Sequence, residues 1–171
     1  MNAMQTIRIE KVTLNIGAGK DQTKLEKGIA LIKAVTGIEP VKTITNKRIA
    51  AWGLRPGLPI GCKLTMRKQS ALQVLARLLA AKENKLKPEN FDDCGNLSFG
   101  IAEYIDIPGV TYDPKIGVLG LQICVTLERP GYRIKRRKWA PKKIPKRHVV
   151  AKEESMAFFK NQFKVSIEGA E

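Results

Sequence analysis

This sequence has few of the residues on which catalytic and metal-binding sites depend. His148 is the only histidine among 171 residues, and the three cysteines stand far apart, without a CxxC pair. Zinc sites and disulfide frameworks use closely spaced or paired ligands, so neither is predicted and the thiols are expected to be reduced. A single histidine within a basic segment also provides no Ser-His or Cys-His pair. We therefore expect no metal, no cofactor and no enzymatic activity.

Long apolar stretches are also missing. No run of 18 apolar residues occurs in the sequence, and its first residues lack the apolar core of a signal peptide. A membrane-spanning helix needs about 20 consecutive apolar residues, and export needs the signal. The sequence therefore predicts a cytoplasmic protein with no membrane partner.

Acidic residues are absent from two long segments. Residues 40–82 contain nine basic residues, residues 129–147 contain ten, and neither segment contains an acid. The remainder of the chain has more acids than bases, so the formal net charge of +15 arises entirely from these two segments. Charge that served only solubility would be spread more evenly. This distribution indicates a surface that binds a polyanion.

The pattern of apolar residues predicts an α+β fold. Alternation predicts strands over 7–16, 41–45, 62–67 and 118–128, while 96–107 is ambiguous between a strand and irregular structure. Helical spacing predicts helices over 23–37, 70–82 and 152–162, the first two starting at capping boxes formed by Thr23 with Glu26 and by Ser70 with Gln73. The polar segment 82–97 is expected to be a surface connection. Because strands and helices do not alternate strictly, we expect the helices to pack on one face of a largely antiparallel sheet.

The whole chain, residues 1–171, is expected to form a single domain. Residues 1–128 would be its globular core, 129–150 a basic extended arm, and 151–171 a C-terminal helix with a tail. The arm contains Pro130, Pro141 and Pro145 and has no helical periodicity. It is therefore not expected to fold alone.

The predicted strands over 7–16 and 62–67 alternate apolar residues with cations, hydroxyls and amides. Side chains two residues apart lie on the same side of a strand, so each strand offers a flat polar surface suited to phosphate, sugar and base contacts. With two residues of the segment 41–45 and the cations of the arm, these surfaces give the predicted RNA contacts: Lys11, Thr13, Asn15, Lys42, Thr45, Lys63, Thr65, Arg67, Arg133, Lys135, Arg136, Arg137 and Lys138.

A loop punctuated by glycines and prolines precedes the strand over 62–67. It interleaves one aromatic side chain with cations, a combination that suits base stacking together with phosphate contact. The predicted RNA-contacting residues of this loop are Asn46, Lys47, Arg48, Trp52 and Arg55.

Other functions fit these features less well. The turn Gly17-Ala18-Gly19-Lys20 follows a strand, but a P-loop would need glycine at Leu14 and a hydroxyl at Asp21, so an NTP site is not predicted. The basic run 135–138 alone could be a localisation signal or a solvated tail. Non-specific DNA binding would not need a polar strand face, and no basic recognition helix is present. A nucleic-acid-acting enzyme remains the alternative, although no carboxylate set or histidine base supports it.

Several segments resemble one known family. In chain order they are VTLNIGAGK (12–20), TITNKRIAAWGLRPGLPIGCKLTMR (43–67), FDDCGNLSFGI (91–101) with EYIDIPGVTYDP (103–114), and ERPGYRIKRRK (128–138). Together they span nearly the whole chain and resemble the universal large-subunit ribosomal protein L-five family, which binds 5S rRNA. The basic arm followed by His148 and a KEES helix is similar to the archaeal and eukaryotic branch. The N-terminal helix of bacterial members is not found.

The resemblance implies a structural component of the large ribosomal subunit whose sheet faces 5S rRNA. Large-subunit rRNA and neighbouring large-subunit proteins would be further partners. It also implies that the loop over 46–59 approaches the P-site tRNA, and that residues 100–115 face a small-subunit head protein as part of an intersubunit bridge. The polar strand faces agree independently with the first of these implications.

Overall fold

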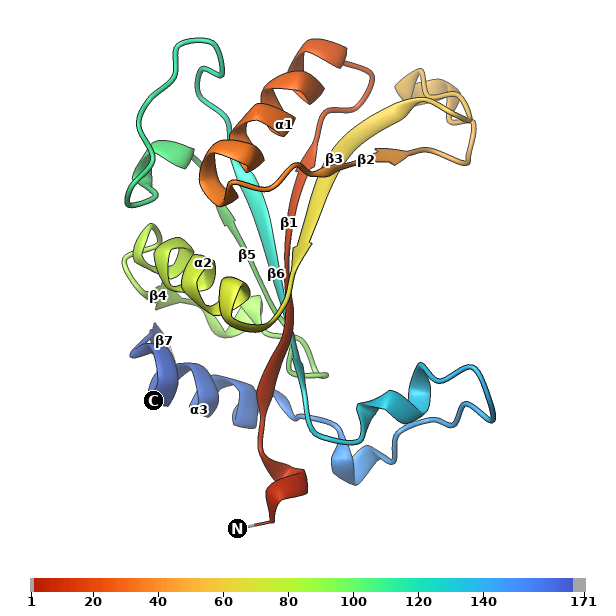
Figure 1. Cartoon of the computed structure of the whole chain (residues 1–171), viewed down its shortest axis with the longest axis vertical. Helices are drawn as coiled ribbons and strands as arrows, with labels where there is room; N and C mark the ends of the chain where they lie inside the picture. Colours follow the sequence, from red (N-terminus) through yellow and green to blue (C-terminus); the bar gives the residue numbers. More distant parts are fainter. Residues whose placement is uncertain (1, 168–171) are drawn as a thin grey trace. The chain divides into compact units, whose positions relative to one another are not determined.

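The structure is a computed structural model that describes residues 2–167, so the last four residues of the predicted C-terminal tail lie outside the described part. The described residues contain a five-stranded antiparallel sheet and three α-helices (Figure 1). In the sheet order β2-β3-β1-β6-β5, the strands are Val41–Ile44, Pro59–Met66, Arg8–Gly17, Leu121–Glu128 and Leu97–Ile101. The helices are α1 (Gln22–Thr36), α2 (Lys68–Ala80) and α3 (Lys152–Phe163). The predicted α+β class is confirmed.

The chain forms two compact units. The loop unit comprises residues 13–66 and 99–123, and the arm unit comprises the described residues 2–12, 67–98 and 124–167. The strands β1, β5 and β6 contribute residues to both units. The organisation as a single domain stays a prediction.

In the loop unit, the core lies between α1 and the apolar side of the strands. Helix α1 packs on β3 and buries Leu25, Leu31, Ile32 and Val35. Gly28 lets the helix approach closely, because a Cβ atom there would come within 3.2 Å of the Cys62 sulfur and of Ile16. Burial at this contact raises the pKa of the Cys62 thiol. The predicted alternation of β1 and β3 therefore provides the surface on which α1 packs.

Both predicted capping boxes are wrong, while the predicted C-terminus of the first helix is confirmed. Helix α1 starts at Gln22 and α2 at Lys68, and neither has a side-chain cap. The Thr23 hydroxyl lies in the first turn and pairs with the Asp21 carboxylate (3.4 Å), and the Ser70 hydroxyl donates to the Arg67 carbonyl (2.9 Å). Gly37 ends α1 in the left-handed region, with φ of 74°.

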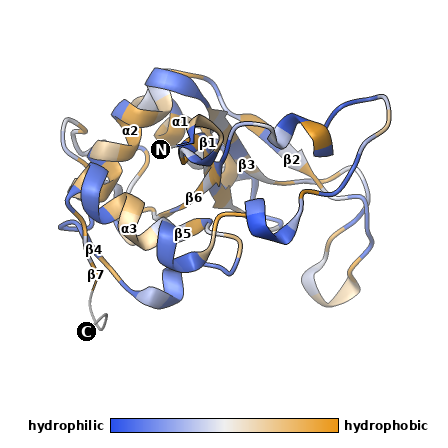
Figure 2. Cartoon of the chain, turned by 90° about the horizontal axis from the view of Figure 1, so that it is seen from below, coloured by the Kyte–Doolittle hydropathy of each residue, from blue (hydrophilic) through white to orange (hydrophobic). Residues whose placement is uncertain are grey.

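The core of the arm unit is formed by α2, α3 and residues of the connection between α2 and β5. Figure 2 shows hydrophobic and hydrophilic residues alternating along α2 and α3, as expected for amphipathic helices. The Phe159 ring of α3 is fully buried and packs edge-on against Phe91. Leu86 is also buried, and it lies in β4 (Lys85–Leu86), which pairs in parallel with β7 (Ser166–Ile167). Most of the segment 82–97 lies at the surface, as predicted for a connection, but it also contributes Leu86 and Phe91 to the core, which was not predicted.

The structure also defines the strand boundaries in the segments 96–107 and 118–128. The ambiguous segment 96–107 contains β5 followed by a 3-10 turn, Tyr104–Asp106. The strand predicted from 118 begins only at Leu121. At the preceding Gly120, a Cβ atom would come within 2.7 Å of the carbonyl oxygens of Ile101 and Ala102, so a larger residue would not fit. No helix among residues 2–167 has the length and apolar character needed to cross a membrane.

Candidate nucleic-acid interface

A polar surface covers two adjacent strands of the loop unit. Thr13 and Asn15 of β1 are half-buried, and Lys63 and Thr65 of β3 are exposed. Residues of opposite phase in the same strands, such as Leu14, are buried. Because β1 and β3 are neighbours in the sheet, these four side chains form one solvent-facing surface, here called the polar strand face (Thr13, Asn15, Lys63 and Thr65). The predicted alternation is confirmed in both strands.

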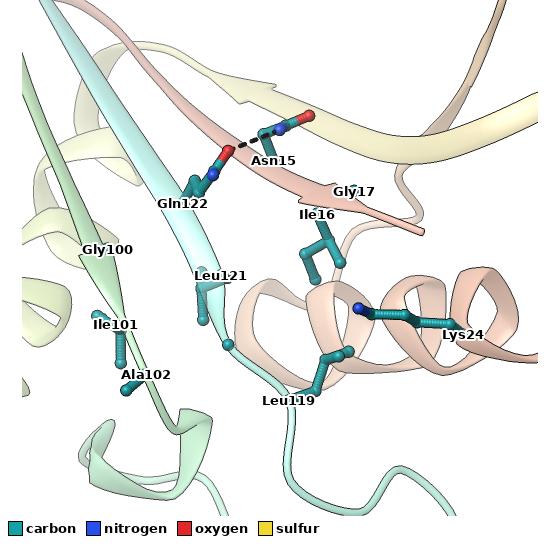
Figure 3. A pocket seen from close by; sticks show the side chains of 11 residues that line it. Asn15, Ile16, Gly17, Lys24, Gly100, Ile101, Ala102, Leu119, Leu121 and Gln122 are labelled. Carbon is teal, nitrogen blue, oxygen red and sulfur yellow. Dashed lines mark hydrogen bonds between the residues drawn. The ribbon is translucent and has the colours of Figure 1, made fainter. Parts of the chain in front are cut away.

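A groove of about 460 Å³ lies beside Asn15 (Figure 3). The Asn15 amide nitrogen donates to the Gln122 side-chain oxygen (3.1 Å), which leaves the Asn15 oxygen and the Gln122 nitrogen for an external partner. Apolar side chains, including Ile16 and Leu119, line the groove, and Lys24 reaches along it from α1. An apolar floor with a donor, an acceptor and a cation can accommodate an unstacked base and its phosphate.

The β2–β3 loop (residues 45–58) is folded. The Thr45 N–H donates to the Leu58 carbonyl (3.0 Å), and farther out Ile49 and Leu54 exchange backbone hydrogen bonds of 3.1 and 3.0 Å. A 3-10 turn over Ala50–Trp52 forms the tip, and the buried side chain of Leu54 anchors it. The loop side chains therefore project from a defined backbone.

The cations and the tryptophan predicted for this loop are at its surface. Trp52 is 68% exposed, although a large aromatic side chain is usually mostly buried. The other members of the predicted set are also exposed: Asn46, Lys47, Arg48 and Arg55. An exposed indole among cations on a fixed backbone favours a stacking partner with negative charge.

One predicted RNA contact near this loop is used internally. Thr45 is only 8% exposed, and its hydroxyl donates to the Lys47 carbonyl (3.1 Å) and accepts from the Lys47 N–H (3.3 Å). The Thr45 hydroxyl therefore stabilises the backbone at the start of the loop and is not directed at an RNA partner. Lys42, on the edge strand β2, is exposed.

The basic arm (residues 129–150) connects β6 to α3 and is closed at its base. The Tyr132 hydroxyl donates to the His148 carbonyl (3.1 Å) and accepts from the Val150 N–H (3.2 Å), and the His148 ring donates to the Pro130 carbonyl (2.9 Å). Burial raises the pKa of the Tyr132 phenol. Short 3-10 turns occur at Tyr132–Lys135 and Lys146–His148. These contacts fix where the arm leaves and rejoins the arm unit.

Two of the ten cations of the arm are committed to carboxylates. Arg129 is buried and pairs with Glu154 (2.5 Å). Arg136, a predicted RNA contact, pairs with both Glu10 and Glu128 at 2.6 Å. The other eight cations are exposed, as is Trp139 at 83%: Arg133, Lys135, Arg137, Lys138, Lys142, Lys143, Lys146 and Arg147. These eight are the cations that the arm offers to a polyanion.

The pairs of Arg136 belong to a larger group, here called the arginine–carboxylate cluster (Arg8, Glu10, Arg67, Glu128 and Arg136). Arg67, another predicted RNA contact, lies 3.3 Å from Glu10, and Arg8 lies 2.7 Å from Glu128. This cluster was not predicted from the sequence. A signal was present, because Glu10 shares the strand phase of Val12 and Leu14, and an acid in phase with the core needs an internal partner. Lys11, on the other phase, is half-buried.

Neither the glycine turn nor the possible metal ligands among the described residues form a nucleotide or metal site. In the glycine turn, the N–H groups of Ala18 and Gly19 both donate to the Ile60 carbonyl (2.9 and 3.0 Å), so they are not directed at a phosphate. Among residues 2–167, no group of three or more His, Cys, Asp or Glu side chains is arranged to hold a metal ion. The three cysteines are unpaired thiols.

The segment 103–118 of the loop unit differs in character from these basic surfaces. Tyr104 is buried, and its hydroxyl accepts from the Asp113 N–H (2.9 Å), which fixes the segment. Tyr112 and Val118 are nevertheless more than half exposed. The segment contains three acids and one lysine. An apolar, acidic surface is better suited to a protein than to RNA.

Sequence comparisons match both parts of the chain to one family. Residues 2–55 match the family described as Ribosomal protein L5, and residues 59–158 match the model that describes the C-terminus of the same ribosomal family. The chain belongs to the ribosomal protein L5 family. Its relatives include archaeal proteins named large ribosomal subunit protein uL5. The protein of Sulfurisphaera tokodaii is 46% identical over 98% of this chain and 95% of its own length. Those of Nanoarchaeum equitans and Methanosphaera stadtmanae are 48% and 45% identical, over 96% and 98% of this chain and 97% and 100% of their own lengths.

The L5 family membership confirms two sequence predictions. The motifs resemble this family, and the three relatives are archaeal, which agrees with the archaeal and eukaryotic branch predicted from the basic arm and the KEES helix. Members of the L5 family are structural proteins of the ribosome, so the chain is not an enzyme, and the alternative of a nucleic-acid-acting enzyme is set aside. The individual contact residues stay predictions.

Proposed function

We propose that this protein, a structural component of the large subunit of cytoplasmic ribosomes, binds 5S rRNA through the polar strand face. The observation that carries the proposal is the placement of Thr13, Asn15, Lys63 and Thr65 on the solvent side of two adjacent strands whose other side is core. Hydroxyl and amide groups can hydrogen-bond bases and 2′-hydroxyls, and Lys63 can neutralise a phosphate. The groove beside Asn15 gives an unpaired nucleotide of 5S rRNA a place to insert.

The basic arm would add affinity through rRNA backbone contacts. Its eight exposed cations come with no acid between residues 129 and 147, so they can approach phosphates of 5S rRNA or of adjacent large-subunit rRNA. Trp139 is exposed enough to stack on an unpaired base. Side chains of this kind increase affinity for RNA without selecting its sequence.

The β2–β3 loop would contact the P-site tRNA. Its tip carries Arg48, Trp52 and Arg55 on a folded extension that does not belong to the polar strand face. The segment 103–118, which overlaps the predicted bridge segment 100–115, would face a protein of the small-subunit head. Its exposed Tyr112 and Val118 and its surplus of acids suit a protein partner. Neighbouring large-subunit proteins would be further partners.

Binding of the full-length protein to total RNA tests the central proposal. After incubation at moderate salt and recovery of the protein, we expect one small, stable RNA of 5S rRNA size to be retained in preference to transfer RNA. The RNA should remain intact on prolonged incubation, because the protein is a structural component. Retention of all RNAs in proportion to their length would contradict specific recognition of 5S rRNA.

The loop and the polar strand face should be separable by mutation. Arg48→Ala with Arg55→Ala removes two exposed loop cations without removing core residues. We expect the affinity for isolated 5S rRNA to change less than about twofold, since neither side chain lies on the polar strand face, while tRNA binding to ribosomes that contain the variant is weakened. Filter binding with isolated 5S rRNA and with assembled ribosomes measures the two effects. Loss of 5S rRNA binding would mean that the loop and the strands bind the same RNA.

A further inference from the structure

We propose that Glu10 and Glu128 position the basic arm for RNA binding by holding Arg136, and that Arg136 is not itself a phosphate ligand. The inference rests on the proposed function, in which the arm contacts rRNA. It assigns a role to two acids that would otherwise only oppose RNA binding.

Arg136 bridges two different strands with the two ends of its guanidinium. Its Nη1 lies 2.6 Å from a Glu10 oxygen on β1, and its Nη2 lies 2.6 Å from a Glu128 oxygen at the end of β6. The carboxylate side chains are only 7% and 10% exposed. A planar guanidinium with nitrogens directed at two acceptors fixes both position and orientation, which the single ammonium of lysine would not do.

Each carboxylate also has a second arginine. Glu10 has Arg67 at 3.3 Å, and Glu128 has Arg8 at 2.7 Å. The cluster therefore contains two acids and three arginines, and Arg136 is the one that comes from the arm. Mostly buried carboxylates are costly without partners, so they favour the conformation in which Arg136 stays between them. The Arg136 side chain is 43% exposed, but its Nη1 and Nη2 atoms already donate to these carboxylates and not to an external phosphate.

The bridge acts on an arm whose two ends are already joined. Tyr132, His148 and Val150 close the base, as described above. Beyond Arg136, the Arg137 side chain donates to the Ala140 carbonyl (2.9 Å), and the Lys142 N–H donates to the Ile134 carbonyl (3.3 Å). These contacts hold the arm backbone that carries the eight exposed cations before RNA arrives. Pre-ordering reduces the conformational entropy lost on binding, so it increases affinity without adding a contact.

The first test removes the acids while keeping their shape. Glu10→Gln with Glu128→Gln makes the protein two charges more positive, and charge alone would then strengthen RNA binding. We expect the opposite, a loss of about tenfold in 5S rRNA affinity, since the arm is no longer held. Glu89→Gln, at an exposed acid of the same unit, is the matched control and should leave affinity unchanged or slightly increased. An affinity increase in the double variant would overturn the proposal.

The second test compares salt dependence for two arm cations. A cation that contacts phosphate contributes about 0.7–0.9 to the slope of log affinity against log salt. Lys138→Gln should therefore reduce the slope by about one, whereas Arg136→Gln should weaken binding with the slope unchanged. An equal reduction for both variants would make Arg136 an ordinary phosphate contact and would overturn its positioning role.

A third measurement needs no RNA and separates this inference from the proposed function. Limited trypsin digestion of the free protein should cleave the arm several times faster in Arg136→Gln than in Lys138→Gln, with the far-ultraviolet circular dichroism of both variants unchanged. Equal cleavage rates would show that Arg136 does not hold the arm. If the wild-type protein failed to bind 5S rRNA while the cleavage difference persisted, the proposed function would be wrong, but the role of Arg136 in holding the arm would still be supported.

Discussion

Replacing residues 133–147 by a short glycine-serine linker should weaken 5S rRNA binding and flatten its salt dependence, and it should leave the protein folded. The deletion removes nine exposed cations, of which all but Arg136 are free of a described ion pair with a carboxylate. If about four of them contact phosphates, the slope of log affinity against log salt falls by about 2.8 to 3.6. The penalty would then be about 50- to 150-fold larger at 50 mM than at 200 mM salt.

The structure explains why this deletion should be tolerated. Tyr132, His148 and Val150 remain to close the base, and the Arg129–Glu154 pair is retained. Glu10 and Glu128 lose Arg136 but keep Arg67 and Arg8 as partners. Titrations at several salt concentrations, with a thermal melt as the control for folding, measure the effect. An unchanged salt slope in a folded variant would show that the arm does not contact the RNA.

The layered fold could be predicted because its signals are local. Buried residues alternate with half-buried ones along β1 and with exposed ones along β3, so Leu14 and Asn15 could be assigned to opposite faces from the sequence alone. The end of α1 at Gly37 was predictable for the same reason, since a left-handed residue there needs glycine. Helix starts were not, because hydroxyls within a first turn resemble capping residues in sequence.

The interactions that the sequence did not predict are those between distant segments. The two-residue strands β4 and β7 are too short to show alternation, and they pair across about half of the chain. Arg136 and Glu10 are separated by 126 residues, so a basic run gives no sign that one of its members is held by an acid. Charge composition correctly located the basic segments. It could not distinguish the cations that face outward from Arg129 and Arg136, which are paired within the protein.

Leu14→Ala and Asn15→Ala should have opposite effects, because these adjacent residues point to opposite sides of β1. Leu14 is fully buried, and its truncation should lower the free energy of unfolding by about 2–5 kcal/mol. The molecules that remain folded should bind 5S rRNA with unchanged affinity. Asn15 is half-buried, and its one described hydrogen bond is to Gln122 near the surface, so its loss should barely change the melting temperature.

The RNA affinity of Asn15→Ala should fall by about 1–3 kcal/mol, which is typical for a polar contact to a base edge or for a partner left unpaired. Gln122→Ala is the matched control, since it removes the same hydrogen bond to Asn15 but leaves the Asn15 amide free to contact RNA. A smaller affinity loss for Gln122→Ala than for Asn15→Ala would assign the contact to Asn15 itself. Melting curves and RNA titrations on the three variants provide the comparison. If Asn15→Ala unfolded the protein while RNA affinity stayed intact, the polar strand face would not be the RNA-binding surface, because the residue would then serve the core and not the partner.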